Sequence, residues 1–337
     1  MSRQAEILST HTAELFRSAV RRAAELLRAG EIVALPTETV YGLAANALEA
    51  RAVNRIYEIK GRPARNPIIV HVASLEMARR CTREWPERAS RLAAAFWPGP
   101  LTLVLLRSAE IPDAVTASGE TVGIRWPSHP LIQAVIRECG FPLAAPSANL
   151  SNQISPTNAE HVRKTLGDQI RLIVDGGQAQ VGIESTVLDL SVDPPRLLRP
   201  GMIHVESLVA VTGRLQTGGA GETHLKSPGL LRKHYSPKAK LLVRSWRNEE
   251  DLQRVLAAAG YPWETAAVIA HSRIPLSAGF GSVSVIPHDP EAFARALYAE
   301  LHRCDEAGVR CIVVEELPSG VEWLAIADRL RRAAAED

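Results

Sequence analysis

The sequence contains only four cysteines, and their positions match no metal-binding or disulfide pattern. Cys81, Cys139, Cys304 and Cys311 form no CxxC pair, and none has a histidine at metal-ligand spacing. Scattered cysteines of this kind favour free thiols in a reducing compartment. We therefore expect no zinc finger and no other metal site built by the protein.

Long apolar runs and a secretory leader are also missing. The opening residues, MSRQAEILSTHTAELF, have no apolar segment behind a basic start, and the most apolar stretch, residues 101–106, has the length of a strand. A membrane-spanning helix needs about 20 apolar residues. The sequence therefore predicts a cytoplasmic protein without a membrane anchor.

No strong excess of charge of one sign is present, because 39 Lys and Arg stand against 37 Asp and Glu, a net charge of +2. This balance does not identify a nucleic-acid binder, although a local basic face remains compatible with it. The composition is 46% hydrophobic and 23% charged, as in ordinary globular proteins. A chain of 337 residues exceeds one typical core, so we expect two domains.

Residues 1–212 alternate between helix and strand patterns. Apolar spacing, caps and glycine stops predict helices at 13–28, 50–59, 87–96, 130–139, 158–166 and 205–211. Apolar runs predict strands at 32–35, 68–72, 101–106, 122–126, 142–145, 171–174 and 185–190. Because several strands follow one another without a helix between them, we expect a twisted mixed α/β sheet.

The composition changes after this region. Residues 213–221 are rich in glycine, and we place a linker at 213–238. Residues 239–337 then alternate strand and helix, which predicts a smaller, Rossmann-like parallel α/β domain. Gly279 and Gly281 have no third glycine at the spacing of a dinucleotide fingerprint, so we do not expect an NAD site.

A basic turn follows the predicted helix at 50–59. Lys60, Arg62 and Arg65 lie on a segment that Pro63 and Pro67 stiffen. A rigid turn with three cations at the start of a buried strand suits a polyphosphate, although a solvated basic turn explains the same residues. No GxxxxGK[ST] loop is present, so any ATP site is not of the Walker type.

Further polar residues lie at the predicted strand ends. Arg125 and Arg199 are cations among apolar neighbours, and such cations need a partner or an anionic ligand. His71 lies inside an apolar strand, where a core histidine and a pocket residue are both possible. The remaining candidates stand on polar segments that ordinary turns also explain: Thr37, Ser147, Asn149 and Thr186.

Seven separated strings resemble the YrdC-type domain of threonylcarbamoyl-AMP synthases. They are LPTETVYGLAANA (35–47), IYEIKGRPARNPIIVHV (56–72), FWPGPLTLVL (96–105), VGIRWPSHP (122–130), APSANLSNQISPT (145–157), DGG with GIESTVLDL (175–190) and LLRPG (197–201). The segment SPGLLRKHYSPKAKL (227–241) is similar to the linker of the long, two-domain form. The resemblance covers nearly the whole chain after residue 12.

The resemblance implies an activity and a set of contacts. L-threonine, bicarbonate or CO2, and ATP would give L-threonylcarbamoyladenylate and diphosphate with Mg²⁺. A transfer complex would then modify the tRNA adenosine next to the anticodon, and tRNA itself is a candidate partner of the chain. Catalytic charge stabilisation is implied for Lys60, Arg62 and Arg199. Threonine contacts are implied for Thr37, His71, Arg125, Ala145 and Thr186. ATP contacts are implied for Lys60, Asn66, Thr121, Ser147, Asn149, Ser155 and Arg199, with Tyr235 of the linker folding over the nucleotide as a lid.

The main alternative is a non-catalytic protein that binds double-stranded RNA or tRNA through phosphates. That function would not need the threonine set around His71 and Arg125. A carbamoyl-transferring maturation enzyme is a second alternative, but it would need a zinc finger that the cysteines do not provide.

Overall fold

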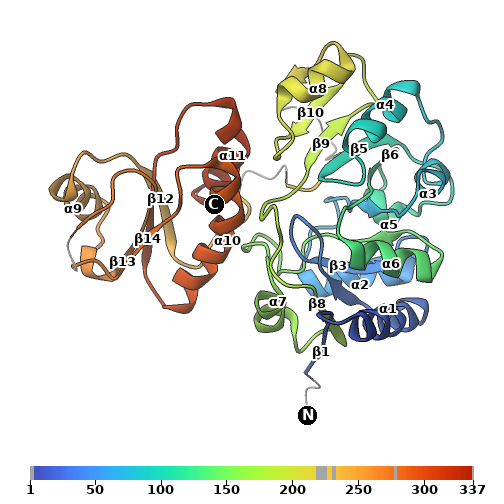
Figure 1. The fold of residues 1–337 in the computed structure, drawn as a ribbon, viewed down its shortest axis with the longest axis horizontal. Helices are drawn as coiled ribbons and strands as arrows, with labels where there is room; N and C mark the ends of the chain where they lie inside the picture. Colours follow the sequence, from blue (N-terminus) through green and yellow to red (C-terminus); the bar gives the residue numbers. More distant parts are fainter. Residues whose placement is uncertain (1–3, 218–225, 230–232, 277–278, 336–337) are drawn as a thin grey trace. The chain divides into compact units, whose positions relative to one another are not determined.

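The computed structural model describes residues 4–217, 226–229, 233–276 and 279–335 (Figure 1). The chain separates into two compact units. The first unit comprises Met1–Ser151 and Ser155–Leu230, and the second comprises Asn152–Ile154 and Leu231–Asp337. The division falls inside the predicted linker, of which residues 218–225 and 230–232 lie outside the described part of the chain.

The first unit combines eleven strands and eight helices within its described residues. The strands are β1 (Glu6–Ser9), β2 (Val33–Leu35), β3 (Gly42–Asn46), β4 (Val70–His71), β5 (Leu101–Leu106), β6 (Thr121–Arg125), β7 (Leu143–Ala144), β8 (Leu172–Asp175), β9 (Thr186–Asp189), β10 (Arg196–Arg199) and β11 (Gln216–Thr217). The helices are α1 (Ala13–Arg28), α2 (Ala50–Lys60), α3 (Leu75–Arg80), α4 (Glu87–Phe96), α5 (Asp113–Thr116), α6 (Pro130–Cys139), α7 (Ala159–Leu166) and α8 (Val205–Thr212).

These strands form one mixed sheet in the order β1-β8-β2-β3-β7-β4-β6-β5-β9-β10-β11. The pairs β4–β6 and β5–β9 are parallel, whereas β4–β7 and β5–β6 are antiparallel. The predicted mixed α/β sheet is confirmed. Strand β3 was not predicted, because its sequence GLAAN lacks the β-branched and aromatic residues that mark strands.

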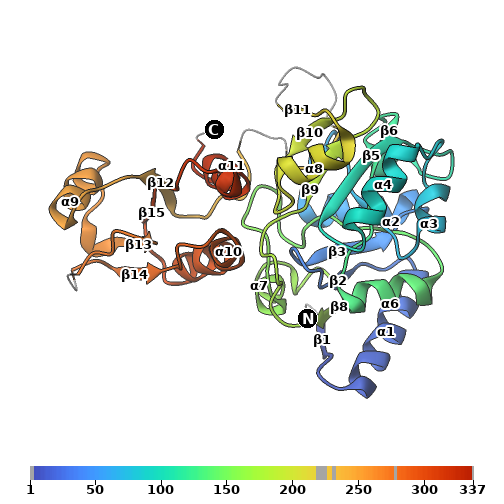
Figure 2. The ribbon, with the colours of Figure 1, turned by 45° about the horizontal axis from the view of Figure 1, so that its top comes forward.

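Helices cover the sheet through apolar faces. Thr12 caps α1 by accepting a hydrogen bond from the Leu15 amide at 3.2 Å. α1 lies beside α6 in both views, and the two helices share a buried cluster with β2 and β8 (Figures 1 and 2). Because each strand and helix is buried through its apolar face, the polar residues of the unit gather at strand ends and in loops.

The second unit is a four-stranded parallel sheet. Its strands are β12 (Lys240–Arg244), β13 (Ala266–Ala270), β14 (Ser282–Val285) and β15 (Cys311–Glu315), in the order β12-β15-β13-β14. Helix α9 (Glu249–Ala258) lies on one side of this sheet, and α10 (Pro290–Glu306) and α11 (Leu324–Ala333) lie on the other (Figure 1). The predicted Rossmann-like parallel domain is confirmed. Among the described residues no helix is both long and apolar enough to cross a membrane.

Candidate active site

Four of the predicted site residues lie along one edge of the first sheet. His71 ends β4 and stands opposite Arg125, which ends the parallel strand β6. Strand β9, which begins at Thr186, runs antiparallel to β10, which ends at Arg199. Since β6 is antiparallel to β5 and β5 is parallel to β9, the ends of β4, β6 and β10 and the start of β9 share this edge.

Arg125 is buried and is held by the loop that follows β2. Its Nη1 donates to Thr39 Oγ1 at 2.9 Å, and its Nη2 lies 2.8 Å from Glu38 Oε2. The other oxygen of Glu38 accepts from the Ser128 amide at 3.1 Å. Burial acts to raise the pKa of Glu38, but the Arg125 charge and the Ser128 amide hold that pKa below its ordinary value. Arg125 and Glu38 therefore form a buried ion pair.

Glu38 is a site residue that the sequence analysis missed. The sequence predicts that Arg125 needs a partner or an anionic ligand, and the resemblance implies a threonine contact for it, whereas in this structure the carboxylate beside Arg125 belongs to Glu38. The signal was present, because an acidic residue in the TET segment directly after a buried strand is a candidate partner for a buried cation. The threonine contact of Arg125 stays a prediction.

His71 is buried beside Arg125 and is uncharged. Burial and, to a smaller extent, the Arg125 charge lower the pKa of His71 to about 3. Its Nδ1 has no hydrogen-bond partner among the described residues. A buried imidazole with an open nitrogen can bind a ligand hydroxyl, but it does so as a neutral group.

Thr37 organises the loop that contacts Arg125. Its hydroxyl donates to the Val40 carbonyl at 2.6 Å and accepts from the Thr39 and Val40 amides, both at 3.2 Å. This local turn holds Thr39 toward Arg125. The backbone of residues 181–182 bonds to the carbonyls of Glu38 and Thr39, which joins the segment before β9 to the same loop.

Ser155 and Arg199 attach to the segment that leads into β9. Ser155 Oγ donates to Glu184 Oε1 at 2.6 Å. The guanidinium of Arg199 donates to the carbonyl and the hydroxyl of Ser185 and to the Pro228 carbonyl, each at 3.1 Å. Both predicted ATP residues are therefore buried and oriented by the same short segment.

Thr186 begins β9 and is fully buried. Its hydroxyl accepts from the Ile203 amide at 3.2 Å and lies 3.3 Å from the Ile203 carbonyl. Gly201 passes so close that a Cβ there would collide with the Thr186 amide. The glycine of the LLRPG string is thus required for the chain to pass the start of β9.

Lys60 lies at the end of α2, inside a cage of backbone carbonyls. Its Nζ donates to the Ser147 carbonyl at 2.6 Å and to the Asn149 carbonyl at 2.5 Å. Burial and the nearby Arg62 charge hold the pKa of Lys60 well below its ordinary value. An ammonium group has three donors, so two fixed carbonyls orient the third toward a further acceptor.

The turn after Lys60 is fixed by Arg62. Its Nε donates to the Asn66 carbonyl at 2.9 Å and its Nη2 to the Pro67 carbonyl at 2.7 Å. The carboxamide of Asn66 is buried, yet neither its nitrogen nor its oxygen has a hydrogen-bond partner among the described residues. Buried polar groups are almost always paired, so an open carboxamide here indicates a ligand. Arg62 shapes the turn in which Asn66 stands.

The remaining predicted residues occupy different places. Thr121 begins β6, four residues before Arg125 and about 13 Å along the strand, and it pairs with Leu106 of β5. Ala145 follows β7, and its amide donates a hydrogen bond to the Ile69 carbonyl at 3.1 Å. Ala145 therefore lies next to the start of β4, whereas Thr121 lies at the opposite end of β6 from Arg125.

Tyr235 is packed within the second unit. Its ring stacks on Tyr298 of α10 at 5.9 Å between ring centroids, and Arg329 of α11 lies 5.4 Å from its centroid. The side chain is buried. A lid function of Tyr235 over a nucleotide stays a prediction.

The chain matches two family models that together span most of its length. Residues 25–201 match the Sua5/YciO/YrdC model, described as "Telomere recombination". Residues 203–335 match a model described as "Threonylcarbamoyl-AMP synthase, C-terminal domain".

Similar proteins carry the name threonylcarbamoyl-AMP synthase. The protein of that name from Bacillus subtilis is 43% identical over 94% of this chain and 92% of its own length. The one from Pyrococcus abyssi is 39% identical over 94% of both chains. A solved structure described as P. abyssi Sua5 complexed with L-threonine is 38% identical, with a TM-score of 0.88 over 97% of this chain and 96% of that one.

Proposed function

Because the chain belongs to the Sua5/YciO/YrdC family, we propose that it is a threonylcarbamoyl-AMP synthase, which makes L-threonylcarbamoyladenylate from L-threonine, bicarbonate or CO2, and ATP. The structural observations that support this proposal are the buried Asn66 carboxamide, which has no hydrogen-bond partner among the described residues, and the Lys60 ammonium held by two backbone carbonyls. No observation favours a non-catalytic RNA-binding protein, and the matched relatives are named as synthases.

Threonine occupies the edge formed by β4, β6 and β9. Arg125 offers a guanidinium for the amino acid carboxylate, and the neutral imidazole of His71 offers a hydrogen bond to the threonine hydroxyl. Thr37, Ala145 and Thr186 border the same strands. Glu38 keeps Arg125 oriented while its ligand is absent.

The nucleotide occupies the side of β4 that faces the basic turn. Lys60, Asn66 and Thr121 lie at this end, and Ser147 and Asn149 supply the carbonyls that hold Lys60. The positions of Ser155 and Arg199 extend the ATP site toward β9. In this proposal, threonine and ATP bind next to each other along β4.

The reaction needs positioning and charge stabilisation, and no covalent nucleophile. The threonine amine adds to CO2 and loses a proton, which gives a carbamate. A carbamate oxygen then forms a bond to the α-phosphorus of ATP while the bond to the β-phosphate oxygen breaks, and diphosphate leaves with the negative charge. Lys60, Arg62 and Arg199 stabilise that charge from fixed positions, which costs no reorganisation during the reaction.

Magnesium enters this proposal as part of the substrate. Among the described residues no group of three or more His, Cys, Asp and Glu side chains is arranged to hold a metal ion. The residues at the phosphate end are cations and amides, which do not suit a Mg²⁺ cage. Mg²⁺ therefore arrives bound to the ATP phosphates.

The product is an activated acyl-adenylate, so a further enzyme must consume it. We propose that the chain passes it to a tRNA threonylcarbamoyl-transfer complex, with direct contact to tRNA during the handover. ATP, bicarbonate and tRNA are available together in the cytoplasm, which is where we propose that the protein acts.

A single assay tests the proposed activity. The purified protein is incubated with ATP, Mg²⁺ and bicarbonate and with threonine, serine or glycine, and diphosphate release is followed. Release should require both bicarbonate and an amino acid and should be fastest with threonine, because His71 provides a partner for the hydroxyl group. ATP consumption that is independent of threonine would contradict the proposal.

A further inference from the structure

The second unit carries a pocket at the carboxyl ends of its four parallel strands. The pocket has a volume of about 480 Å³, a size typical of small-molecule sites. Ser245 follows β12, His271 follows β13, His288 follows β14, and Glu315 ends β15. In open parallel α/β sheets, ligands bind at this edge.

The imidazoles at this edge are fixed by packing and hydrogen bonds. His271 Nε2 donates to the Glu316 carbonyl at 3.1 Å, and its Nδ1 lies 2.8 Å from both Ser272 Oγ and His288 Nδ1. The His271 ring also stacks on Trp323 at 5.9 Å. A ligand that binds here therefore meets groups that are already ordered.

The carboxylate of Glu315 serves the fold of this edge. It accepts hydrogen bonds from the backbone amides of His271, Ser272 and Arg273 at 2.8 to 3.2 Å. These amides hold the pKa of Glu315 below its ordinary value, although burial acts to raise it. Because its charge is already met by three amides, Glu315 shapes the loop in which Arg273 stands.

Several donors around the pocket remain available. Within the described part of the chain, the guanidinium of Arg273 and the hydroxyls of Ser245 and Ser319 have no hydrogen-bond or ion-pair partner, and no bond is formed by His288 Nε2. The pocket lining also contains the negative charge of Glu316, whose carboxylate, unlike that of Glu315, accepts no hydrogen bond from these backbone amides. A guanidinium with hydroxyl and imidazole groups matches the oxygens of a phosphoryl group.

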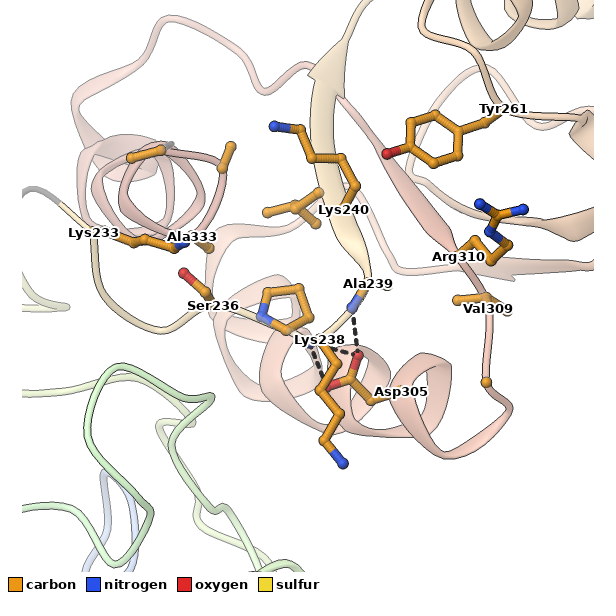
Figure 3. A pocket seen from close by; sticks show the side chains of 15 residues that line it. Lys233, Ser236, Lys238, Ala239, Lys240, Tyr261, Asp305, Val309, Arg310 and Ala333 are labelled. Atoms are coloured by element: carbon orange, nitrogen blue, oxygen red, sulfur yellow. Dashed lines mark hydrogen bonds between the residues drawn. The ribbon is translucent and has the colours of Figure 1, made fainter. Parts of the chain in front are cut away.

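A second pocket of the same unit lies at the other edge of the sheet and has more basic residues in its lining. Lys238, Lys240, Arg310 and Tyr261 are among its lining residues (Figure 3). Lys238 and Lys240 extend in opposite directions there, so their ammonium groups do not converge on one point (Figure 3). We therefore do not propose this pocket as a phosphoryl site, and a residue of its lining serves as a control for the variants below.

We propose that the pocket formed by Ser245, His271, Arg273, His288 and Ser319 binds the phosphoryl group of a small molecule, as a second ligand site apart from the proposed active site. The ligand is a free phosphate, a diphosphate or a nucleoside monophosphate, which share the chemistry that Arg273 and the serine hydroxyls recognise. Neither the proposed reaction nor the family comparison assigns a ligand to this pocket.

The test uses the full-length chain with ¹⁵N-labelled histidine. Imidazole signals of His271 and His288, assigned through a His288→Gln variant, are followed during titration with phosphate, diphosphate and AMP at constant ionic strength. One of the three should shift both signals saturably, and comparison among them identifies the source of the phosphoryl group. Signals that move with none of the three, or equally with chloride, would overturn the proposal.

Three variants separate binding from general electrostatics. Arg273→Ala removes an exposed side chain and should weaken binding of the ligand at least about tenfold without loss of fold. Glu316→Gln removes a negative charge from the pocket lining and should strengthen binding of the ligand. Arg310→Ala, at the opposite edge of the sheet, should leave the affinity for the ligand unchanged. Equal weakening by Arg273→Ala and Arg310→Ala would mean that net charge alone attracts the anion, and the site would then be rejected.

Discussion

The two units use buried charge in different ways. In the first unit, two carbonyls hold Lys60 and leave a third donor open, and the carboxamide of Asn66 is buried without a partner among the described residues. In the second unit, Asp328 is buried against the guanidinium groups of Arg329, Arg331 and Arg332. A buried group whose partners are all protein groups stabilises the fold, whereas one with an open donor or acceptor is available to a ligand.

The strongest test of this comparison is the removal of Lys60. Lys60→Ala should lower kcat/KM for ATP by about 10³-fold, because a pre-oriented charge at the phosphates is lost. Arg65→Ala is the matched control, since Arg65 is an exposed cation of the same turn and should change kcat/KM by less than about threefold. Steady-state diphosphate release measures both. Equal effects of the two variants would show that the turn acts only through its total charge.

The corresponding change in the second unit should affect stability and leave catalysis unchanged. Asp328→Asn keeps the side-chain volume but leaves Arg329 and Arg332 without their buried carboxylate, so it should cost about 3 kcal/mol of unfolding free energy. Arg247→Ala breaks an exposed pair with Asp251 and should leave the free energy of unfolding nearly unchanged. Urea unfolding gives both values. A changed KM in Asp328→Asn would contradict the division of roles.

A substitution of Glu38 tests whether the ion pair between Glu38 and Arg125 serves threonine binding or the stability of the fold. Glu38→Gln preserves the shape but removes the charge that orients Arg125, so KM for threonine should rise about tenfold while kcat changes little. The KM for ATP provides the internal control, because Glu38 has no proposed contact with the nucleotide. A loss of stability with an unchanged KM would make the pair purely structural.

The smallest expected effect is a pH dependence. Because burial and the Arg62 charge hold the pKa of Lys60 well below its ordinary value, raising the pH from neutral toward about 10 should deprotonate Lys60 at a lower pH than an exposed lysine and raise KM for ATP a few-fold. The neutral His71, with a pKa of about 3, should contribute no change over this range. Initial rates at fixed ionic strength measure the profile. A KM for ATP that begins to rise only near pH 10, where an exposed lysine titrates, would contradict a lowered pKa of Lys60.

The sequence predicted the long, periodic elements well. The helices at 13–28, 87–96 and 130–139 and the strand at 101–106 have the predicted bounds, because their caps and apolar runs are local signals. Strands β3 and β10 were not predicted, since GLAAN and RLLR become strands only through pairing with neighbours. Local sequence patterns therefore predicted the long helices and strands, whereas the short strands depend on pairing with their neighbours.

The sequence indicated candidate site residues but not the contacts among them. Lys60, Asn66 and Arg199, which the ordered strings indicated, are buried, and their ligand contacts stay predictions. The partnership of Glu38 with Arg125, by contrast, joins residues 87 positions apart, and no periodicity reveals it. The ring contacts of Tyr235 with Tyr298 and Arg329 depend on the folding of the second unit in the same way.

By itself, the sequence determined the fold class, the existence of two α/β regions and the set of polar residues at strand ends, because these follow from local periodicity and ordered strings. Only the tertiary structure decided which charges neutralise one another and which remain open. The physical reason is that burial and hydrogen-bond partners are properties of segments brought together from distant parts of the chain. Lys60 with residues 147 and 149, and Glu315 with residues 271–273, are the clearest examples.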